Sequence, residues 1–155
     1  MSPLTFAMGR FEAKFPTDRL YSRHHMWLQR DAGRSADATT YRVGLTDYSV
    51  RLLQDVYFLD WAADAPLVVA RRQAIGEVES SKAMSSLYAP AGGTVVRFND
   101  ALMSQPELIN TANYDAGWLF DLQTDDDLMS PDGYVKLLAE IWDDTQRTLQ
   151  GQANT

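Results

Sequence analysis

The sequence predicts a mainly β protein: a small antiparallel sandwich or barrel followed by one C-terminal α-helix. Seven or eight short runs rich in aromatic and β-branched residues are separated by polar or glycine-containing turn signals. Only the last segment keeps the three- and four-residue apolar spacing of a helix over several turns. No fixed-period repeat indicates a solenoid.

The length and composition predict one globular domain. The chain has 155 residues, of which 45% are hydrophobic and 23% are charged. Residues 1–19 mix Pro, Gly and charges without a clear period, so we expect a flexible or loosely docked N-terminal arm. We assign residues 20–150 to the domain and residues 151–155 to a disordered tail.

The first half of the domain predicts strands around one short helix. Strands are expected at 20–29, 41–45, 55–61, 67–70 and 74–80. The polar run 30–40 contains a glycine and indicates a loop. Thr46 and Asp47 are good helix caps, and the apolar residues that follow them have helical spacing, so a short helix is expected here.

The second half predicts three more strands and a short helical turn. The strands are expected at 84–90, 94–99 and 117–123. Pro90, Gly92 and Gly93 mark a turn, and we expect the two glycines to supply positive φ angles. Residues 100–110 indicate a helical turn with Pro106 at its first position.

The strongest helix signal lies at the C-terminal end of the chain. Ser130 can cap the helix, Pro131 fits its first position, and Asp132 complements its positive end. One face repeats Tyr134, Leu137, Leu138, Ile141, Trp142, Thr145 and Leu149. Gly151 predicts the end of the helix.

Charge and cysteine content exclude several classes of function. The net charge of −7 repels nucleic acid and suits partners with basic faces. The chain has no cysteine, so disulfides, thiolate catalysis and zinc–thiolate sites are excluded. No apolar run approaches the roughly 20 residues that span a bilayer, and no secretory signal is seen. We therefore expect a cytoplasmic protein without a membrane partner.

One lysine stands out between two predicted strands, in the run Glu79-Ser80-Ser81-Lys82-Ala83. The simplest interpretation is a solvated surface charge, because lysine is rarely buried. A catalytic lysine is disfavoured because Glu79 would hold the ammonium in its charged form. A third interpretation is an attachment point, since small neighbours in a tight turn leave the amine open to an acylating enzyme.

The same run resembles the lipoyl-attachment motif, with Glu79 three residues before Lys82 and Ala83 directly after it. The flanks resemble the glycine cleavage system H protein family. They contain Pro-Glu-Leu-x-Asn at 106–110, Tyr-x-x-Gly-Trp at 114–118 and the pair His25 and Trp27. The resemblance runs in order from Leu20 to Leu138.

This resemblance implies a barrel-sandwich hybrid with short helical turns and a C-terminal helix, in which Lys82 lies at a hairpin tip. It implies lipoic acid bound to Lys82 by an amide, with Glu79 and Ala83 as the flanks recognised during lipoylation. The implied role is a non-catalytic carrier of an aminomethyl group. The implied partners are glycine decarboxylase, aminomethyltransferase, dihydrolipoyl dehydrogenase, and the lipoate ligase or lipoyl transferase that modifies Lys82.

The chain also departs from the family pattern. Gln54 stands where a glycine is common, and no glycine occurs between Gly44 and Gly76. Two alternatives therefore stay open: an H-like lipoate-binding carrier of another pathway, such as sulfur oxidation, or an unmodified binding module.

Other conspicuous residues receive structural interpretations. On a strand, His24 and His25 would point to opposite faces, so a metal site is not expected. The run Asp125–Asp127 lacks the remaining ligands of a calcium loop and is expected to be a solvated loop. The four tryptophans, Trp27, Trp61, Trp118 and Trp142, are expected to anchor the core. Trp118 has the alternative of lining a groove that shelters the loaded arm.

Overall fold

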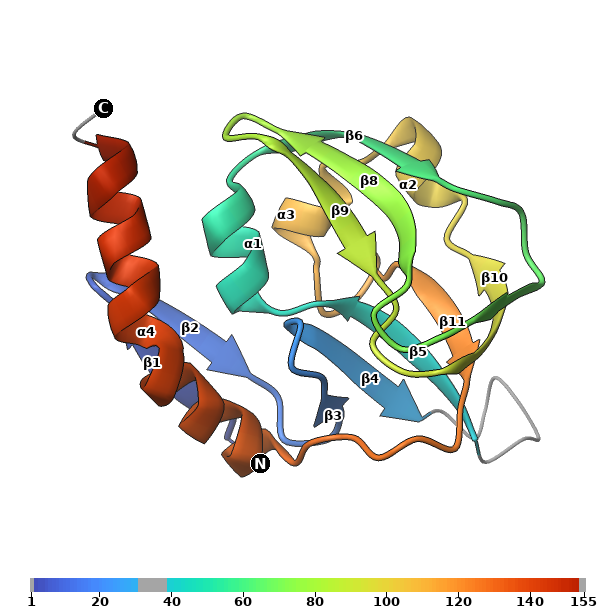
Figure 1. The fold of residues 1–155 in the computed structure, drawn as a ribbon, viewed down its shortest axis with the longest axis horizontal. Helices are drawn as coiled ribbons and strands as arrows, with labels where there is room; N and C mark the ends of the chain where they lie inside the picture. Colours follow the sequence, from blue (N-terminus) through green and yellow to red (C-terminus); the bar gives the residue numbers. More distant parts are fainter. Residues whose placement is uncertain (1, 31–38, 154–155) are drawn as a thin grey trace.

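The computed structural model describes residues 2–30 and 39–153, with side chains described as far as Trp142. Figure 1 shows a β-rich body with one long helix, α4, along its side. The strands are β1 (Leu4–Met8), β2 (Phe11–Phe15), β3 (Leu20–Tyr21), β4 (Met26–Arg30), β5 (Thr40–Leu45), β6 (Val56–Trp61), β7 (Leu67–Val69), β8 (Ala74–Ser80), β9 (Met84–Tyr88), β10 (Gly93–Phe98) and β11 (Phe120–Gln123). The helices are α1 (Asp47–Leu53), α2 (Ala101–Ser104), α3 (Leu108–Thr111) and α4 (Pro131–Ala153).

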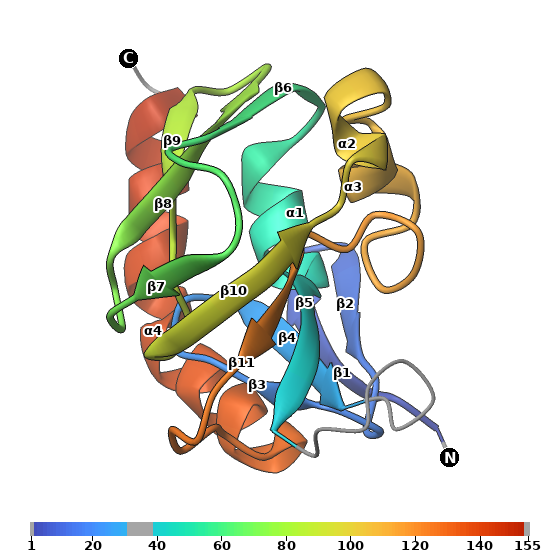
Figure 2. The same ribbon diagram turned by 90° about the vertical axis from the view of Figure 1, so that its right-hand side faces the viewer.

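Two antiparallel sheets form the body. The larger sheet has the order β3-β4-β5-β11-β10-β7, and the smaller has the order β6-β8-β9. Figure 2 shows β10, β11, β5 and β4 side by side, with β6, β8 and β9 as a separate layer above them in the view. This arrangement is the predicted mainly β barrel-sandwich hybrid with a C-terminal helix and short helical turns.

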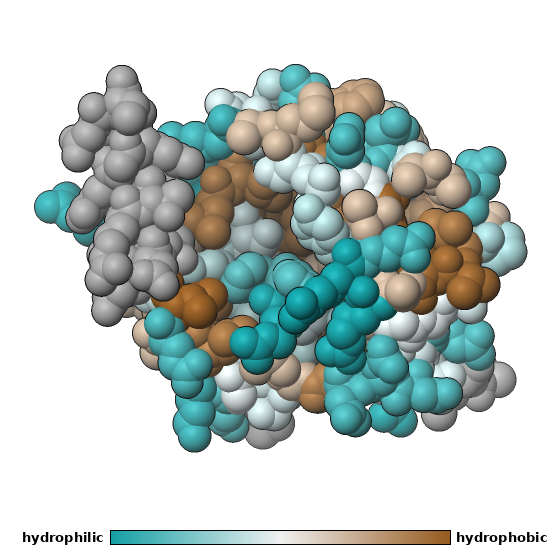
Figure 3. Space-filling view, viewed as in Figure 1, coloured by the Kyte–Doolittle hydropathy of each residue, from teal (hydrophilic) through white to brown (hydrophobic). Residues whose placement is uncertain are grey.

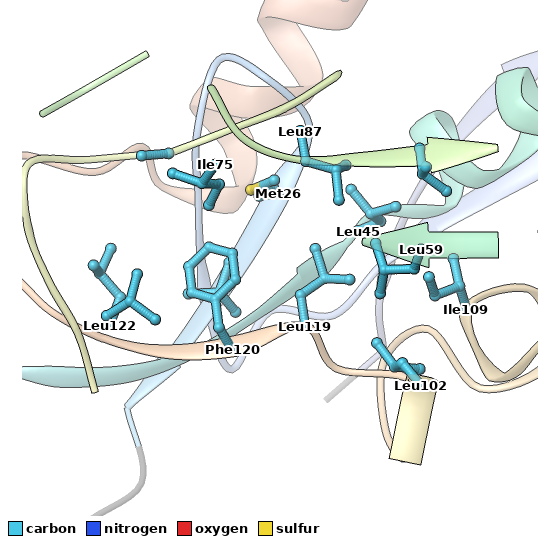
Figure 4. Packing of buried hydrophobic residues seen from close by; sticks show 14 of the residues in the cluster. Met26, Leu45, Leu59, Ile75, Leu87, Leu102, Ile109, Leu119, Phe120 and Leu122 are labelled. Carbon is cyan, nitrogen blue, oxygen red and sulfur yellow. The ribbon is translucent and has the colours of Figure 1, made fainter. Parts of the chain in front are cut away.

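The core lies between the two sheets because the inward side chains of both are apolar. Figure 4 shows Leu45, Phe120 and Leu122 of the larger sheet pointing toward Leu59 and Ile75 of the smaller one. Leu102 of α2 and Ile109 of α3 close one end of this core. Although each of these helices has only four residues, together they cover this end of the core and keep it from solvent.

The N-terminal arm differs from the sequence expectation. It is not loosely docked, because β1 and β2 form a hairpin in which Ala13 and Phe15 are fully buried. Gly9, with φ of +66°, occupies the first position of the two-residue turn, where a positive φ is required. The alternation of Phe11, Ala13 and Phe15 is a strand signal that the mixed composition of the segment obscured.

The hairpin packs against α4 and α1 and forms a second apolar cluster. The ring of Phe15 meets that of Tyr134 at a centroid distance of 5.2 Å, and the ring of Phe6 meets that of Trp142 at 5.9 Å. Trp27 of β4 belongs to this cluster, whereas Met26 and Leu28 face the core between the sheets. Strand β4 is therefore covered on both faces.

Several local predictions are also corrected. The single strand expected at 20–29 is two strands, β3 and β4, joined by a turn at residues 22–25. The helical turn expected at 100–110 is two helices, and Pro106 precedes the first residue of α3 by two positions. Helix α4 begins at Pro131 as predicted but runs two residues past Gly151, to Ala153. The last two residues of the predicted tail, and most of the loop expected at 30–40, lie outside the described residues.

The glycines at 92 and 93 have a different purpose from the one expected. Neither has a positive φ. A Cβ on Gly93 would lie 2.0 Å from the carbonyl oxygen of Gln123, so glycine is needed for the close approach of β10 and β11. The carbonyl oxygen of Gly92 accepts a hydrogen bond from the Thr124 hydroxyl at 2.6 Å.

Candidate functional site

The turn between β8 and β9 places Lys82 at the tip of a hairpin. Ser80 is buried and organises this turn. The Ser80 amide donates to the carbonyl oxygen of Ala83 at 3.0 Å, and the Ser80 hydroxyl accepts weak bonds from the amides of Lys82 and Ala83 at 3.3 and 3.4 Å. The amide of Ser81 donates to the Asp55 carbonyl at 2.9 Å, which ties the turn to the segment before β6. Local serine hydrogen bonds thus hold the backbone while leaving the lysine free.

Lys82 and Ala83 are both exposed. Within the described part of the chain, the Lys82 ammonium has no hydrogen bond or ion pair. Glu79 is half-buried, and its carboxylate accepts a long bond from the Tyr57 hydroxyl at 3.4 Å rather than pairing with Lys82. The structure therefore brings Glu79, Lys82 and Ala83 to one hairpin end, but Glu79 does not hold the amine.

A groove of about 570 Å³ lies beside the hairpin tip, and Lys82 and Ala83 form part of its wall. Figure 3 shows a hollow on this face of the molecule, with apolar side chains inside it. The apolar lining includes Leu45, Leu52, Leu53, Val78 and Leu87, and the polar lining includes Ser49 and Ser85. Helix α1 and strand β9 thus face each other across a groove with both apolar and polar lining, and this groove reaches the lysine.

His24 lines the same groove, and it is a residue that sequence reasoning did not connect with Lys82. Its ring lies 6.1 Å from the ring of Tyr88. Partial burial, with the nearby guanidinium groups of Arg72, Arg23 and Arg71, lowers the pKa of His24. The imidazole is therefore held neutral over a wider pH range than a free histidine.

His25 points away from this groove into the second apolar cluster. Its Nδ1 lies 2.8 Å from the Tyr134 hydroxyl, which lies 2.9 Å from the Thr46 hydroxyl. Burial, reinforced by the neighbouring His24, lowers the pKa of His25 to about 4. The two histidines lie in the turn before β4 rather than on a strand, and His25 has a φ of 68°.

The remaining tryptophans and acidic residues have structural surroundings. Arg42 stacks on Trp118 at 3.8 Å from the ring centroid, and Trp118 is not among the residues of the groove. Trp118 is therefore not part of the groove beside Lys82. Asp126 accepts a hydrogen bond from the Gly92 amide at 2.6 Å, so this part of the acidic loop is hydrogen-bonded to the turn before β10. The described residues contain no group of three or more His, Asp or Glu side chains placed to hold a metal.

Asn110 has a role in the site that the sequence did not reveal. Its Oδ1 accepts from the Val56 amide at 2.8 Å, and its Nδ2 donates to the Gln54 carbonyl at 2.6 Å. One side chain from α3 thus fixes the segment between α1 and β6, and the neighbouring Asp55 carbonyl supports the hairpin tip. An asparagine in a short helix gives no local signal that its side chain will bind the backbone of a segment more than fifty residues earlier.

The chain matches the family model described as glycine cleavage H-protein over residues 19–141. It is 39% identical over 128 residues to the glycine cleavage system H protein of Micrococcus luteus, covering 79% of this chain and 96% of that one. It is 43% identical over 110 residues to the same protein of Mycobacterium tuberculosis, covering 71% of this chain and 78% of that one. The crystal structure of a glycine cleavage system H protein from Mycobacterium marinum matches with a TM-score of 0.68 and 34% identity, covering 79% of this chain and 97% of that chain.

The matched range begins at residue 19, so the β1–β2 hairpin lies outside it. Among the described helices, none combines the length and apolar character needed to cross a membrane.

Proposed function

This chain belongs to the glycine cleavage H-protein family, and on that premise we propose that it is the lipoyl carrier of the glycine cleavage system. The lipoyl group is attached to Lys82 through an amide, and Glu79 and Ala83 are the flanks recognised during attachment. The role is that of a carrier rather than a catalyst. The names of the relatives favour this role over an H-like carrier in sulfur oxidation and over an unmodified binding module.

The exposed position of Lys82 at the hairpin tip is the observation that carries the proposal. An acylating enzyme must bring an activated lipoyl carbonyl to the amine nitrogen. The C–N bond forms as the bond to the leaving group breaks, and the nitrogen gives up its proton. Because the turn is held by Ser80 and not by Lys82, the side chain is free to enter another active site without disturbing the hairpin.

The groove beside Lys82 fits a flexible apolar arm that ends in a sulfur ring. When bound, lipoic acid supplies the redox and thiol chemistry that a chain without cysteine lacks. Leu52, Leu53 and Leu87 offer apolar contacts, while Ser49 and Ser85 offer hydroxyl groups to a polar load. The groove would exclude water from part of the arm between visits to its partners.

The proposed partners are glycine decarboxylase, aminomethyltransferase, dihydrolipoyl dehydrogenase, and the lipoate ligase or lipoyl transferase. A single tethered group that visits several active sites gains a high effective concentration at each of them. The acidic chain, with a net charge of −7, suits rapid association with basic surfaces and rapid release.

The test is a comparison of the wild type with Lys82→Arg. Intact-mass measurement on protein from cells with a lipoylation pathway should show the added lipoyl mass on the wild type alone. The variant should keep the circular dichroism spectrum and melting temperature of the wild type, because an exposed charge is retained. It should lose all activity in a reconstituted glycine cleavage assay. An unmodified wild type, or an active variant, would overturn the proposal.

A further inference from the structure

We propose that the outer face of the β6-β8-β9 sheet is the docking surface for the enzyme that acylates Lys82. We further infer that this enzyme presents basic side chains around an apolar centre. The outer sheet face is defined here by Tyr57, Phe58, Asp60, Glu77, Glu79 and Met84. The inference rests on the proposed lipoyl-carrier function and names a partner surface for it.

The strand register places these side chains together. Phe58 lies opposite Glu79, and Glu79 lies opposite Met84, so the three form one row across the sheet. Phe58 and Met84 are 49% and 60% exposed, and Tyr57, at the bulge of β6, is 58% exposed. Large apolar side chains gathered in one place on a surface are characteristic of an interaction site.

The next row carries charges of one sign. Asp60 lies directly opposite Glu77, and like charges in this position destabilise a sheet. Neither carboxylate has an ion pair with a basic side chain in the described part of the chain. With Glu79, the face presents three carboxylates beside three apolar side chains. A partner with basic residues would relieve this repulsion, which is why the face fits a basic surface.

The position of the face links it to Lys82. Glu79 precedes the lysine by three residues, and Met84 follows it by two, so the first row ends at the hairpin tip. An enzyme that closes on the amine must approach this end of the sheet. The apolar row would form the centre of the interface, and the carboxylates would form its polar rim.

A second copy of this chain is a poorer occupant. A symmetric contact would bring the same acidic face of both copies together. Asp60, Glu77 and Glu79 of one copy would then oppose identical charges. Repulsion between the faces therefore favours a partner of opposite charge.

The experiment measures acylation of the full-length apoprotein by a purified lipoate ligase with lipoate and ATP. Asp60→Lys and Glu77→Lys are each expected to lower kcat/KM by about tenfold, through a higher KM with little change in kcat. Asp125→Lys is the matched charge reversal, at an exposed residue that follows β11 of the larger sheet rather than a strand of the β6-β8-β9 sheet. It should stay within about twofold of the wild type.

The apolar row is tested separately. Phe58→Ser should also raise KM, whereas Val68→Ser, at an exposed valine of the larger sheet, should not. Melting temperatures distinguish docking from folding, because Asp60→Lys removes a like-charge pair and should melt no lower than the wild type.

Wild-type rates for both charge reversals would overturn the docking surface while leaving the carrier function intact. Sedimentation showing a wild-type dimer that Asp60→Lys dissociates would overturn it as well, in favour of self-association. A wild type that the ligase never modifies would instead overturn the proposed function, and this inference with it.

Discussion

At the residue scale, Gln54 occupies a backbone conformation that is found almost only at glycine. It ends α1 with φ of 63° and ψ of −147°, a region that non-glycine residues enter at a cost of roughly 1–3 kcal/mol. The Asn110 side chain holds the Gln54 carbonyl in place. The resemblance already indicated a glycine at this position, and the structure supplies the physical reason.

Gln54→Gly should therefore stabilise the protein by about 1 kcal/mol, since relief of backbone strain exceeds the added freedom of the unfolded chain. Urea denaturation of the two proteins measures the difference. Gln105→Gly is the matched control, because Gln105 ends α2 with an ordinary φ of −134° and should gain nothing. A Gln54→Gly variant that is less stable than the wild type would contradict the strain.

His25 should make stability depend on pH. Its pKa is about 4 in the folded protein and about 6.5 in the unfolded chain, so the folded state favours the neutral ring. The resulting stability is present above the unfolded pKa and is lost as the pH falls toward the folded one. The free energy of unfolding should fall by about 2 kcal/mol between about pH 7 and about pH 5.

His25→Asn should show a much smaller fall over the same range, because asparagine tolerates a positive φ but does not titrate. Denaturant titrations at several pH values measure both proteins. Equal slopes against pH for the two would show that His25 is not the group responsible.

At the element scale, the β1–β2 hairpin is the part of the chain added outside the family match. It covers one side of α4 and meets α1, where the Asp47 carboxylate accepts from the Lys14 amide at 3.0 Å. The Tyr114 hydroxyl donates to the Lys14 carbonyl. The hairpin is thus joined to the body by hydrogen bonds as well as by apolar packing.

Phe15→Ala should test this packing. Phe15 is fully buried against Tyr21 and Tyr134, so its truncation should lower the free energy of unfolding by about 3 to 5 kcal/mol. Phe58→Ala makes the same chemical change at a side chain that is 49% exposed, and should cost less than about 1 kcal/mol. If both changes had the same small effect, the hairpin would not be packed as described.

At the scale of the whole molecule, the two apolar clusters meet at β4. Met26 and Leu28 face the core between the sheets, while Trp27 faces the cluster of the hairpin and α4. The Trp27 indole also donates to the Asn113 carbonyl at 2.9 Å. Neither cluster can lose its packing without uncovering one face of the same strand.

The chain should therefore unfold in a single cooperative transition. Far-ultraviolet circular dichroism and tryptophan fluorescence should give the same midpoint in urea. Phe15→Ala should move both midpoints together, because the damage in one cluster reaches the other through β4. Two separate midpoints in either protein would show that the clusters unfold independently.

Short-range signals explain why much of the fold and site was predictable. The Ser130 cap and Pro131 predict the start of α4, and the Ser130 hydroxyl accepts from the Gly133 amide at 3.0 Å. The exposed lysine between two strands followed from its small neighbours. The prediction of a loosely docked N-terminal arm was wrong because the burial of this arm depends on α4, which lies more than a hundred residues further along the chain.

The sequence by itself determined most strands of the two larger sheets, the start of the final helix and the turn that presents Lys82, because caps, turn residues and apolar spacing act over a few positions. Only the tertiary structure decided that His24 and Lys82 line one groove and that His25 is half-buried beside Tyr134. It also decided that Asn110 holds the segment before β6. These are contacts between distant segments, and they arise only when the sheets, α1, α3 and α4 pack together.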